Sequence, residues 1–259
     1  MFSIATWNVN SLNVRLPHVL TWLRETQPDV LALQEIKCEN EKFPYEDLRE
    51  LGYHALVSGQ KTYNGVAMLS RQPMIHDAIA LGFPNFADEQ KRVLGVQIGD
   101  VYVVDLYVPN GAAIGTDKYD YKLTWLKHLK NFLSELLKQH KKIIVLGDFN
   151  IAPTDDDVHE PLLWKDQVLV SEPERAAWRS LLELGFVDCY RQAPKGDTKF
   201  SWWDYRQAAF RRNLGLRIDH IIASSDMAKQ LVSCEIDKIP RGWERPSDHA
   251  PVLAQFVEN

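Results

Sequence analysis

The chain has 259 residues, of which 45% are hydrophobic and 25% charged, and its formal net charge is −5 at pH 7. These values are typical of a globular protein, and no internal repeat, low-complexity tract or shift in composition divides the sequence. It contains no apolar stretch long enough to span a bilayer, and it begins without the basic and apolar segments of a secretory signal. We therefore expect one domain over residues 1–259 and no membrane partner.

The cysteines favour an intracellular protein. Cys38, Cys189 and Cys234 are widely spaced and odd in number, and they form no paired metal motif. This pattern argues for reduced thiols rather than a disulfide framework. We expect a cytoplasmic location.

Six short apolar runs predict buried strands with polar residues in them or beside their ends. In chain order the runs are Phe2–Trp7, Val30–Gln34, Val101–Leu106, Ile143–Leu146, Leu216–Ile222 and Val252–Val257. The polar residues are Asn8, Asn10, Glu35, Tyr107, Asp148, Asn150, Asp219, Asp248 and His249. A buried charge is costly unless a metal or partner compensates it, and ligands gather at strand ends in open sheets. The sequence therefore predicts an active site where these runs converge.

The run from Ile143 to Asn150 is the clearest case. Gly147 is predicted to end the strand. If the extended backbone continues beyond it, Asp148 and Asn150 share one face and could hold one reacting group. Asn8 and Asn10 repeat this spacing after the first run.

Each of these residues alone also fits a structural role. Asn8 and Asn10 fit turn residues that bond their own backbone, and Glu35 fits a solvated loop. Tyr107 fits a core residue, and His220, within an apolar run, is predicted to be structural rather than a ligand. The joint occurrence of the set favours chemistry.

Helical spacing of apolar residues predicts helices over Leu16–Thr26, Tyr121–Gln139 and Glu174–Leu184. Ser171 and Glu174 form a capping-box pattern, and Gly185 follows the last of these helices. Strands alternating with helices and hairpins indicate a layered α/β chain.

The segment Thr154–Val170 is the least structured part of the sequence. Its acidic run, Asp155-Asp156-Asp157, is predicted to be a solvated loop. A loop of this length in a compact domain is often functional.

The negative net charge counts against a nucleic-acid partner, but the distribution of basic residues is more informative. The basic groups are Lys118, Lys122, Lys127 and Lys130; Arg206, Arg211, Arg212 and Arg217; and Arg241 with Arg245. The lysines fit a solvated helix face as well as a DNA footprint. The segment Trp202–Arg217 interleaves aromatic side chains with arginines, as surfaces do where bases or sugars stack and phosphates are neutralised.

The order of motifs resembles the signature of the exonuclease III family, DNA repair nucleases within the endonuclease/exonuclease/phosphatase superfamily. The matching blocks are Trp7–Leu12, Leu33–Lys37, Tyr107–Gly111, Gly147–Thr154, Phe200–Arg206, Gly215–Asp219 and Pro246–Val252. The resemblance extends over nearly the whole chain. It implies an α+β sandwich of two mixed β-sheets packed face to face, with helices outside and the site at one edge.

The resemblance and the residues together predict metal-assisted hydrolysis of a phosphodiester. We expect Mg²⁺, with Mn²⁺ as a possible substitute, because few carboxylates with several waters suit such a hard cation. Glu35 is the predicted principal ligand. The other predicted ligands are Asn8, Asp148, Asn150 and Asp248.

Proton transfer is assigned to neighbouring residues. Asp148 is the predicted general base for the attacking water, and Asn150 is expected to position that water or a phosphate oxygen. His249, oriented by Asp219, and Tyr107 are expected to donate to the phosphate as charge develops. Tyr107 or a metal-bound water could instead act as the acid or base.

The predicted partner is duplex DNA with abasic sites or 3′ ends, bound by a monomer. The resemblance places Trp202, Leu216 and Ile218 in a pocket for an extruded abasic sugar. The other predicted substrate-binding residues are Asn10, Asn110, Arg211 and Arg212. Trp203 fits a core residue equally well.

The expected activities are incision 5′ to abasic sites, 3′-end cleaning and 3′ to 5′ digestion, and the segment Thr154–Val170 is where relatives are expected to differ. One alternative is a phosphodiesterase or phosphatase on the same scaffold that acts on inositol phosphate, sphingomyelin or RNA. Another is a catalytically silent nucleic-acid-binding protein. The Trp202 block favours DNA, and the complete catalytic set favours an enzyme.

Overall fold

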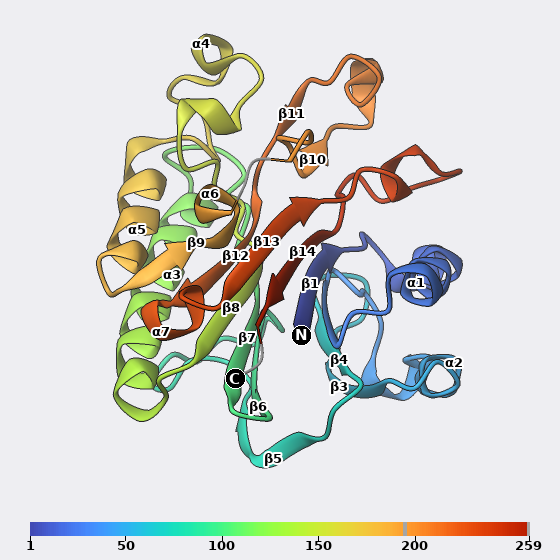
Figure 1. Ribbon diagram of the computed structural model, residues 1–259. Helices are drawn as coiled ribbons and strands as arrows, with labels where there is room; N and C mark the ends of the chain where they lie inside the picture. The colour runs from blue at the N-terminus through green and yellow to red at the C-terminus, as the bar shows by residue number, and fades with distance from the viewer. Residues whose placement is uncertain (194–195, 258–259) are drawn as a thin grey trace.

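Two six-stranded mixed sheets pack face to face in the computed structural model, which describes residues 1–193 and 196–257 (Figure 1). In spatial order the first sheet contains β13 (Leu231–Ile236), β14 (Val252–Phe256), β1 (Phe2–Asn8), β2 (Val30–Gln34), β4 (Val66–Ser70) and β3 (His54–Ser58). The second contains β5 (Met74–Ala80), β6 (Val93–Ile98), β7 (Val101–Tyr107), β8 (Ile143–Asp148), β12 (Asp219–Ser224) and β9 (Phe186–Asp188). A short hairpin joins β10 (Trp202–Trp203) to β11 (Gly215–Leu216). This is the sandwich that the resemblance to the exonuclease III family implied.

Helices cover the outer face of each sheet. α1 (Leu12–Thr26) and α2 (Tyr45–Arg49) pack on the first sheet, while α3 (Asp117–Gln139) and α5 (Glu172–Leu182) pack on the second (Figure 1). The shorter helices are α4 (Pro161–Trp164), α6 (Cys189–Gln192), α7 (Ser225–Ala228), η1 (Asn40–Lys42), η2 (Asp155–Asp157), η3 (Arg206–Ala208) and η4 (Pro240–Gly242). No helix in the described residues is long and apolar enough to cross a membrane.

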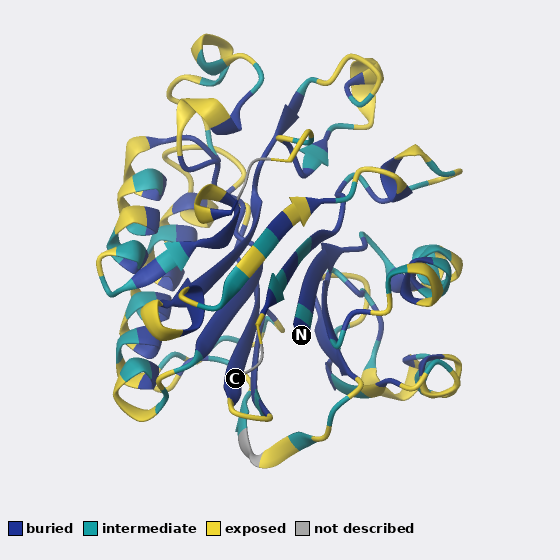
Figure 2. Cartoon of the chain, in the orientation of Figure 1, coloured by how far each residue is buried: buried dark blue, intermediate teal, exposed yellow. Residues whose placement is uncertain are grey.

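The apolar strand runs are continuous because both of their faces are buried. In β8, Ile144 and Leu146 point into the core between the sheets, whereas Ile143 and Val145 pack beneath α3 and α5. Figure 2 shows this burial as dark strands between helices with exposed outer faces.

The helices begin earlier than predicted. α1 begins at Leu12 rather than Leu16, because Leu12 is buried and its N–H donates to Ile36 O at 3.0 Å. α3 begins at Asp117, where the side chain of Thr116 caps it. The predicted capping box at the start of α5 is confirmed.

The prediction of a fully solvated acidic run is wrong for Asp157. Asp155 and Asp156 are exposed, but Asp157 is 1% exposed. Its carboxylate accepts from Arg217 Nε at 2.7 Å and from Arg191 Nη2 at 2.5 Å, and these pairs compensate its burial.

Three of the basic residues that were considered for a DNA surface are also buried. Lys122 is paired with Glu174, Arg217 with Asp157 and Asp188, and the side chain of Arg241 donates to Trp203 O. Their charged groups make these contacts in the interior and are not available to bind DNA at the surface. The exposed basic residues of the predicted groups are Lys118, Lys127, Arg206, Arg211, Arg212 and Arg245.

Candidate active site

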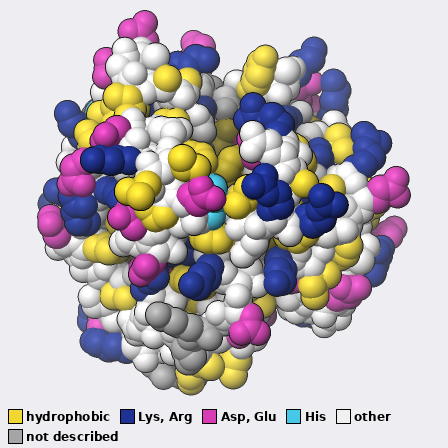
Figure 3. Space-filling view, turned by 90° about the horizontal axis from the view of Figure 1, so that it is seen from above, with side chains coloured by type: hydrophobic (Ala, Val, Ile, Leu, Met, Phe, Trp, Pro, Cys, Tyr) yellow, Lys and Arg dark blue, Asp and Glu magenta, His cyan; other side chains and the backbone are white. Residues whose placement is uncertain are grey.

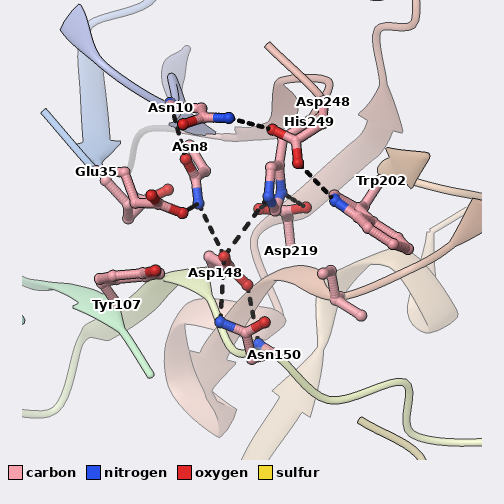
Figure 4. A network of polar contacts seen from close by, with 12 residues as sticks. Asn8, Asn10, Glu35, Tyr107, Asp148, Asn150, Trp202, Asp219, Asp248 and His249 are labelled. Atoms are coloured by element: carbon pink, nitrogen blue, oxygen red, sulfur yellow. Dashed lines mark hydrogen bonds and ion pairs between the residues drawn. The ribbon is translucent and has the colours of Figure 1, made fainter. Parts of the chain in front are cut away.

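The predicted strand ends meet at one edge of the sandwich. β1 and β2 are parallel, so Asn8 and Glu35 lie near the same ends of neighbouring strands. β7 and β8 are also parallel, with Tyr107 opposite Asp148, and the antiparallel β12 places Asp219 opposite Asp148 from the other side. Figure 4 shows these side chains pointing toward a common centre.

Tight turns, rather than continued strands, direct several of these side chains. Asn10, Glu35 and Asn150 have φ values of 43°, 49° and 48°. The extended path expected beyond Asp148 is therefore wrong, since the left-handed backbone of Asn150 turns the chain back. Asp148 and Asn150 still come together, because Asn150 N donates to Asp148 Oδ1 at 2.9 Å. Asn8 Oδ1 likewise accepts from Asn10 N at 3.0 Å, so the turn role considered for these asparagines coexists with their place in the site.

Gly147 continues β8 instead of ending it. Its φ is 146°, and a Cβ at this position would lie 1.9 Å from Leu106 O on the neighbouring β7. Glycine is required here because the two backbones approach so closely. This approach sets Tyr107 and Asp148 side by side.

Asn8 connects the two central carboxylates. Its Nδ2 donates to Glu35 Oε1 and to Asp148 Oδ2, each at 2.9 Å (Figure 4). Glu35, Asp148 and His249 offer ligand atoms that all lie within 4.8 Å of one another. Carboxylate oxygens are donors that a hard divalent cation prefers, so Glu35 and Asp148 fit such an ion.

Lys37 is a site residue that the sequence reasoning missed. Its Nζ lies 3.0 Å from Glu35 Oε2 and donates to Asn10 Oδ1 at 2.7 Å. Lys37 follows Glu35 by two residues inside a matching block, and that proximity was the available signal. The contact fixes the orientation of Glu35 and partly balances its charge.

His249 is held by Asp219, as expected. Its Nδ1 lies 2.9 Å from Asp219 Oδ2, which also accepts a hydrogen bond from the hydroxyl of Ser201 at 2.6 Å. Burial alone would lower the pKa of His249, but the neighbouring carboxylates, first Asp219 and then Asp148, raise it to about 10. The ring is therefore a cation at neutral pH and can donate from Nε2.

Asp148 and Tyr107 titrate far from their ordinary ranges. Burial raises the pKa of Asp148 to about 7, against the opposing effect of His249, whose Nε2 lies 3.8 Å from Asp148 Oδ2. Burial, and next the charges of Glu35 and Asp148, raises the pKa of Tyr107 well above its usual value. Tyr107 is thus a protonated donor, and Asp148 has a basicity suited to general-base chemistry near neutral pH.

Asp248 lies beside this group, but its two oxygens already have partners. Its Oδ2 accepts from Trp202 Nε1 at 2.9 Å, and its Oδ1 accepts from Asn10 Nδ2 at 3.1 Å. Asp248 is not one of the three residues in the acid and imidazole cluster. Its assignment as a metal ligand stays a prediction.

The predicted pocket residues form one apolar cluster next to the site. Leu216 and Ile218 are buried, and Trp202 packs against their cluster, which also contains Leu169. The cluster is completed by Ala152, Val158, Val170, Trp164 and Val168. Trp203, by contrast, is 1% exposed and belongs to the core between the sheets.

The remaining predicted substrate residues occupy the surroundings. Asn110 donates to Asn150 Oδ1 at 3.2 Å and lines a pocket of about 500 Å³ with Lys118. Arg211 and Arg212 are exposed between β10 and β11. Seen from above, Lys and Arg side chains lie around a central region that contains hydrophobic, acidic and histidine side chains (Figure 3).

His220 has the structural role that was expected. Its Nε2 contacts Ile151 O at 2.8 Å and its Nδ1 lies 3.0 Å from Arg217 Nη1, both in the interior. Burial lowers its pKa to about 4, so the ring is neutral.

Comparisons with known proteins agree with this geometry. The model of the Endonuclease/Exonuclease/phosphatase family matches residues 5–249. Exodeoxyribonuclease III of Haemophilus influenzae is 38% identical over 266 residues, covering 97% of this chain and 98% of the relative. Among solved structures, the 3′ phosphatase NExo from Neisseria, bound to a product DNA hairpin, has a TM-score of 0.96 and 44% identity, with both chains fully covered. An AP endonuclease from Archaeoglobus fulgidus has a TM-score of 0.95 and 40% identity, again over both whole chains.

Proposed function

This chain belongs to the exonuclease III family, within the Endonuclease/Exonuclease/phosphatase family, and on that premise we propose that it cleaves duplex DNA at abasic sites and 3′ ends with Mg²⁺ as its cofactor. It is a hydrolase with the function of a DNA repair nuclease, and its family is metal-dependent. The observation that carries the proposal is the meeting of Glu35, Asp148 and His249 at one edge of the sandwich.

The carboxylates and amides at the centre would hold the ion. Glu35 is the principal candidate, and the others are Asn8, Asp148, Asn150 and Asp248. When bound, Mg²⁺ would neutralise charge on the phosphate and on the departing 3′ oxygen, and Mn²⁺ could substitute for it. Lys37 would keep the carboxylate of Glu35 in place through its ion pair.

Asp148 takes the proton from the attacking water. Its pKa, raised by burial to about 7, makes it a stronger base than a surface carboxylate while it remains largely ionised at slightly alkaline pH. Asn150, bonded to Asp148 through its backbone N–H, orients the water or a phosphate oxygen.

His249 and Tyr107 stabilise the negative charge that develops on the phosphate. The imidazolium of His249 is kept charged by Asp219, and the hydroxyl of Tyr107 is kept protonated by burial. Donors that are already oriented need no rearrangement during the reaction, and one such donor contributes roughly 10²- to 10³-fold in rate.

Substrate choice is assigned to the apolar cluster and the exposed arginines. Trp202, with the buried Leu216 and Ile218 packed behind it, would form the wall beside an extruded abasic sugar, and extrusion is least costly where base pairing is already lost. Arg211 and Arg212 contact phosphates, while Asn10 and Asn110 hold the strand beside the reacting bond.

The proposal is tested with three labelled duplexes: one with an abasic analogue, one with a 3′ phosphate and one intact. Cleavage is measured with Mg²⁺, with excess chelator, and after Mg²⁺ or Mn²⁺ is restored. We expect loss and recovery of activity, and we expect Glu35→Ala to raise the Mg²⁺ concentration needed for half-maximal cleavage. Undiminished cleavage in excess chelator would refute the mechanism. Binding of all three duplexes without cleavage would identify a silent DNA-binding protein.

The remaining proposals concern the state of the protein in the cell. Cys38, Cys189 and Cys234 are free and buried, which supports a reducing compartment such as the cytoplasm. We also propose that the protein is a monomer. Sedimentation equilibrium with and without duplex DNA tests the second point.

A further inference from the structure

A buried lysine behind the site makes three polar contacts. Lys122, on α3, is fully buried, and its ammonium group has three N–H donors. They donate hydrogen bonds to Glu174 Oε1, to Asn150 O at 2.6 Å and to Asn110 O at 3.2 Å. Two of these acceptors are backbone carbonyls of predicted site residues.

The contact with Asn150 completes the attachment of that residue. Asn150 N donates to Asp148, its Nδ2 donates to Val108 O at 2.9 Å, and its Oδ1 accepts from Asn110. Lys122 binds the remaining polar group, the backbone carbonyl. Because Asn150 has a left-handed backbone, its position depends on these outside contacts.

Glu174 connects the same ammonium group to the segment beside the apolar cluster. Its Oε1 also accepts from Leu169 N at 3.0 Å, and Leu169 O accepts from Ala152 N at 2.8 Å. Its Oε2 accepts from both the N–H and the hydroxyl of Ser171, completing the capping box of α5. One buried ion pair thus joins α3, α5, the Asn150 turn and Leu169.

We propose that Lys122 is a positioning residue, whose ammonium group, supported by Glu174, holds the Asn150 turn so that Asp148 and Asn150 are oriented for cleavage. This inference rests on the proposed nuclease function. Any buried ammonium group needs acceptors for its three N–H donors, and the informative point is where those acceptors lie. Here the lysine directs two of its three donors to the backbone of residues beside the candidate base.

The test uses the full chain with Mg²⁺ and compares single-turnover cleavage with DNA affinity. Lys122→Met removes the donors but leaves Glu174 as an unpaired buried charge, which works against folding. Lys122→Met with Glu174→Gln avoids that charge, and Gln retains the capping-box role. We expect this double variant to lose roughly 10- to 100-fold in cleavage rate, because small displacements of reacting groups have effects of that size. Its Kd for DNA should change only a few-fold.

Leu129→Ala is the matched control, since Leu129 is fully buried on the same helix and belongs to the core beneath the second sheet. It should lower Tm without a comparable loss of rate. Each change is then repeated in an Asn150→Ala background. If Lys122 acts through the turn, its effect on the rate shrinks in that background, whereas independent effects would multiply.

The outcomes separate the inference from the function on which it rests. A parent protein that fails to cleave DNA refutes the proposed function. A parent that cleaves, with a double variant whose rate is no lower than that of Leu129→Ala, overturns the role of Lys122. Fully multiplicative effects with Asn150→Ala overturn it as well.

Discussion

At the scale of single residues, Asp148 is held by contacts on both of its carboxylate oxygens. Its Oδ2 accepts from Asn8, its Oδ1 accepts from the backbone of Asn150, and the imidazolium of His249 lies 3.8 Å away. Burial nevertheless raises its pKa to about 7, so the carboxylate can accept a proton in the range where the reaction would run.

We predict that Asp148→Asn lowers single-turnover cleavage by roughly 10²- to 10⁴-fold, because the shape remains while the base is lost. DNA affinity should persist. The matched control is Asp105→Asn on β7. Burial raises the pKa of Asp105 well above its usual value, which favours its uncharged form, so this amide substitution should change the rate little. A rate for Asp148→Asn within a few-fold of the parent would show that another group is the base.

At the scale of elements, the register of β7 and β8 places the site. The two strands run parallel, and Gly147 allows the backbone of Leu106 to approach closely enough for Tyr107 to lie opposite Asp148. A side chain at position 147 would meet backbone atoms, which cannot rotate out of the way.

We predict that Gly147→Ala destabilises the fold by about 3 kcal/mol or more, because overpacking is added to a left-handed φ. Gly52→Ala is the matched control. Gly52 has a φ of 86° but nothing within 4 Å of an added Cβ, so it should lose only about 1 kcal/mol through backbone strain. Urea unfolding measures both variants. Equal losses would mean that the contact with Leu106 is relieved by a small shift of the strands.

At the scale of the whole molecule, the net charge of −5 does not show that acidic and basic side chains lie in different places. Acidic side chains gather at the centre of the site, where a divalent cation would offset them, and exposed arginines lie on the β10 to β11 hairpin. Buried Lys122 and Arg217 contribute to the total charge but not to the surface. We therefore expect the binding of a polyanion to depend on where exposed basic residues lie relative to the site rather than on the net charge.

We predict that Arg211→Ala with Arg212→Ala lowers the salt dependence of DNA binding, by roughly one unit of slope for each phosphate that the variant no longer neutralises. Binding isotherms at several salt concentrations measure the slope. An unchanged slope would move the footprint elsewhere, first to exposed Lys118 and Lys127 on α3.

Trp202→Ala provides the contrast for this experiment, because an apolar wall contributes stacking and shape instead of charge. It should leave the salt slope nearly unchanged and weaken cleavage at an abasic site more than digestion of an intact 3′ end. Equal loss on both substrates would mean that Trp202 supports the fold, as Trp203 does within the core.

The sequence by itself determined the runs that form β1, β2, β7, β8 and β14, the family, and most of the residues that meet at the sheet edge. The predicted single run Leu216–Ile222 is wrong, because it divides into β11 and β12, which belong to different sheets. Buried strands produce short apolar runs, and an unusual polar residue beside each run is visible without coordinates. The capping box of Ser171 and Glu174 was equally readable, because it depends on neighbours three residues apart.

The tertiary structure decided which charges face solvent and how the turns direct their side chains. Lys122 and Asp157 looked like surface residues, and only their partners Glu174 and Arg217, 52 and 60 residues away in sequence, show why they are buried. The return of Asn150 toward Asp148 likewise depends on a left-handed turn held by contacts from α3. Periodicity reports local burial, whereas the pairing of buried charges is a property of elements that only folding brings together.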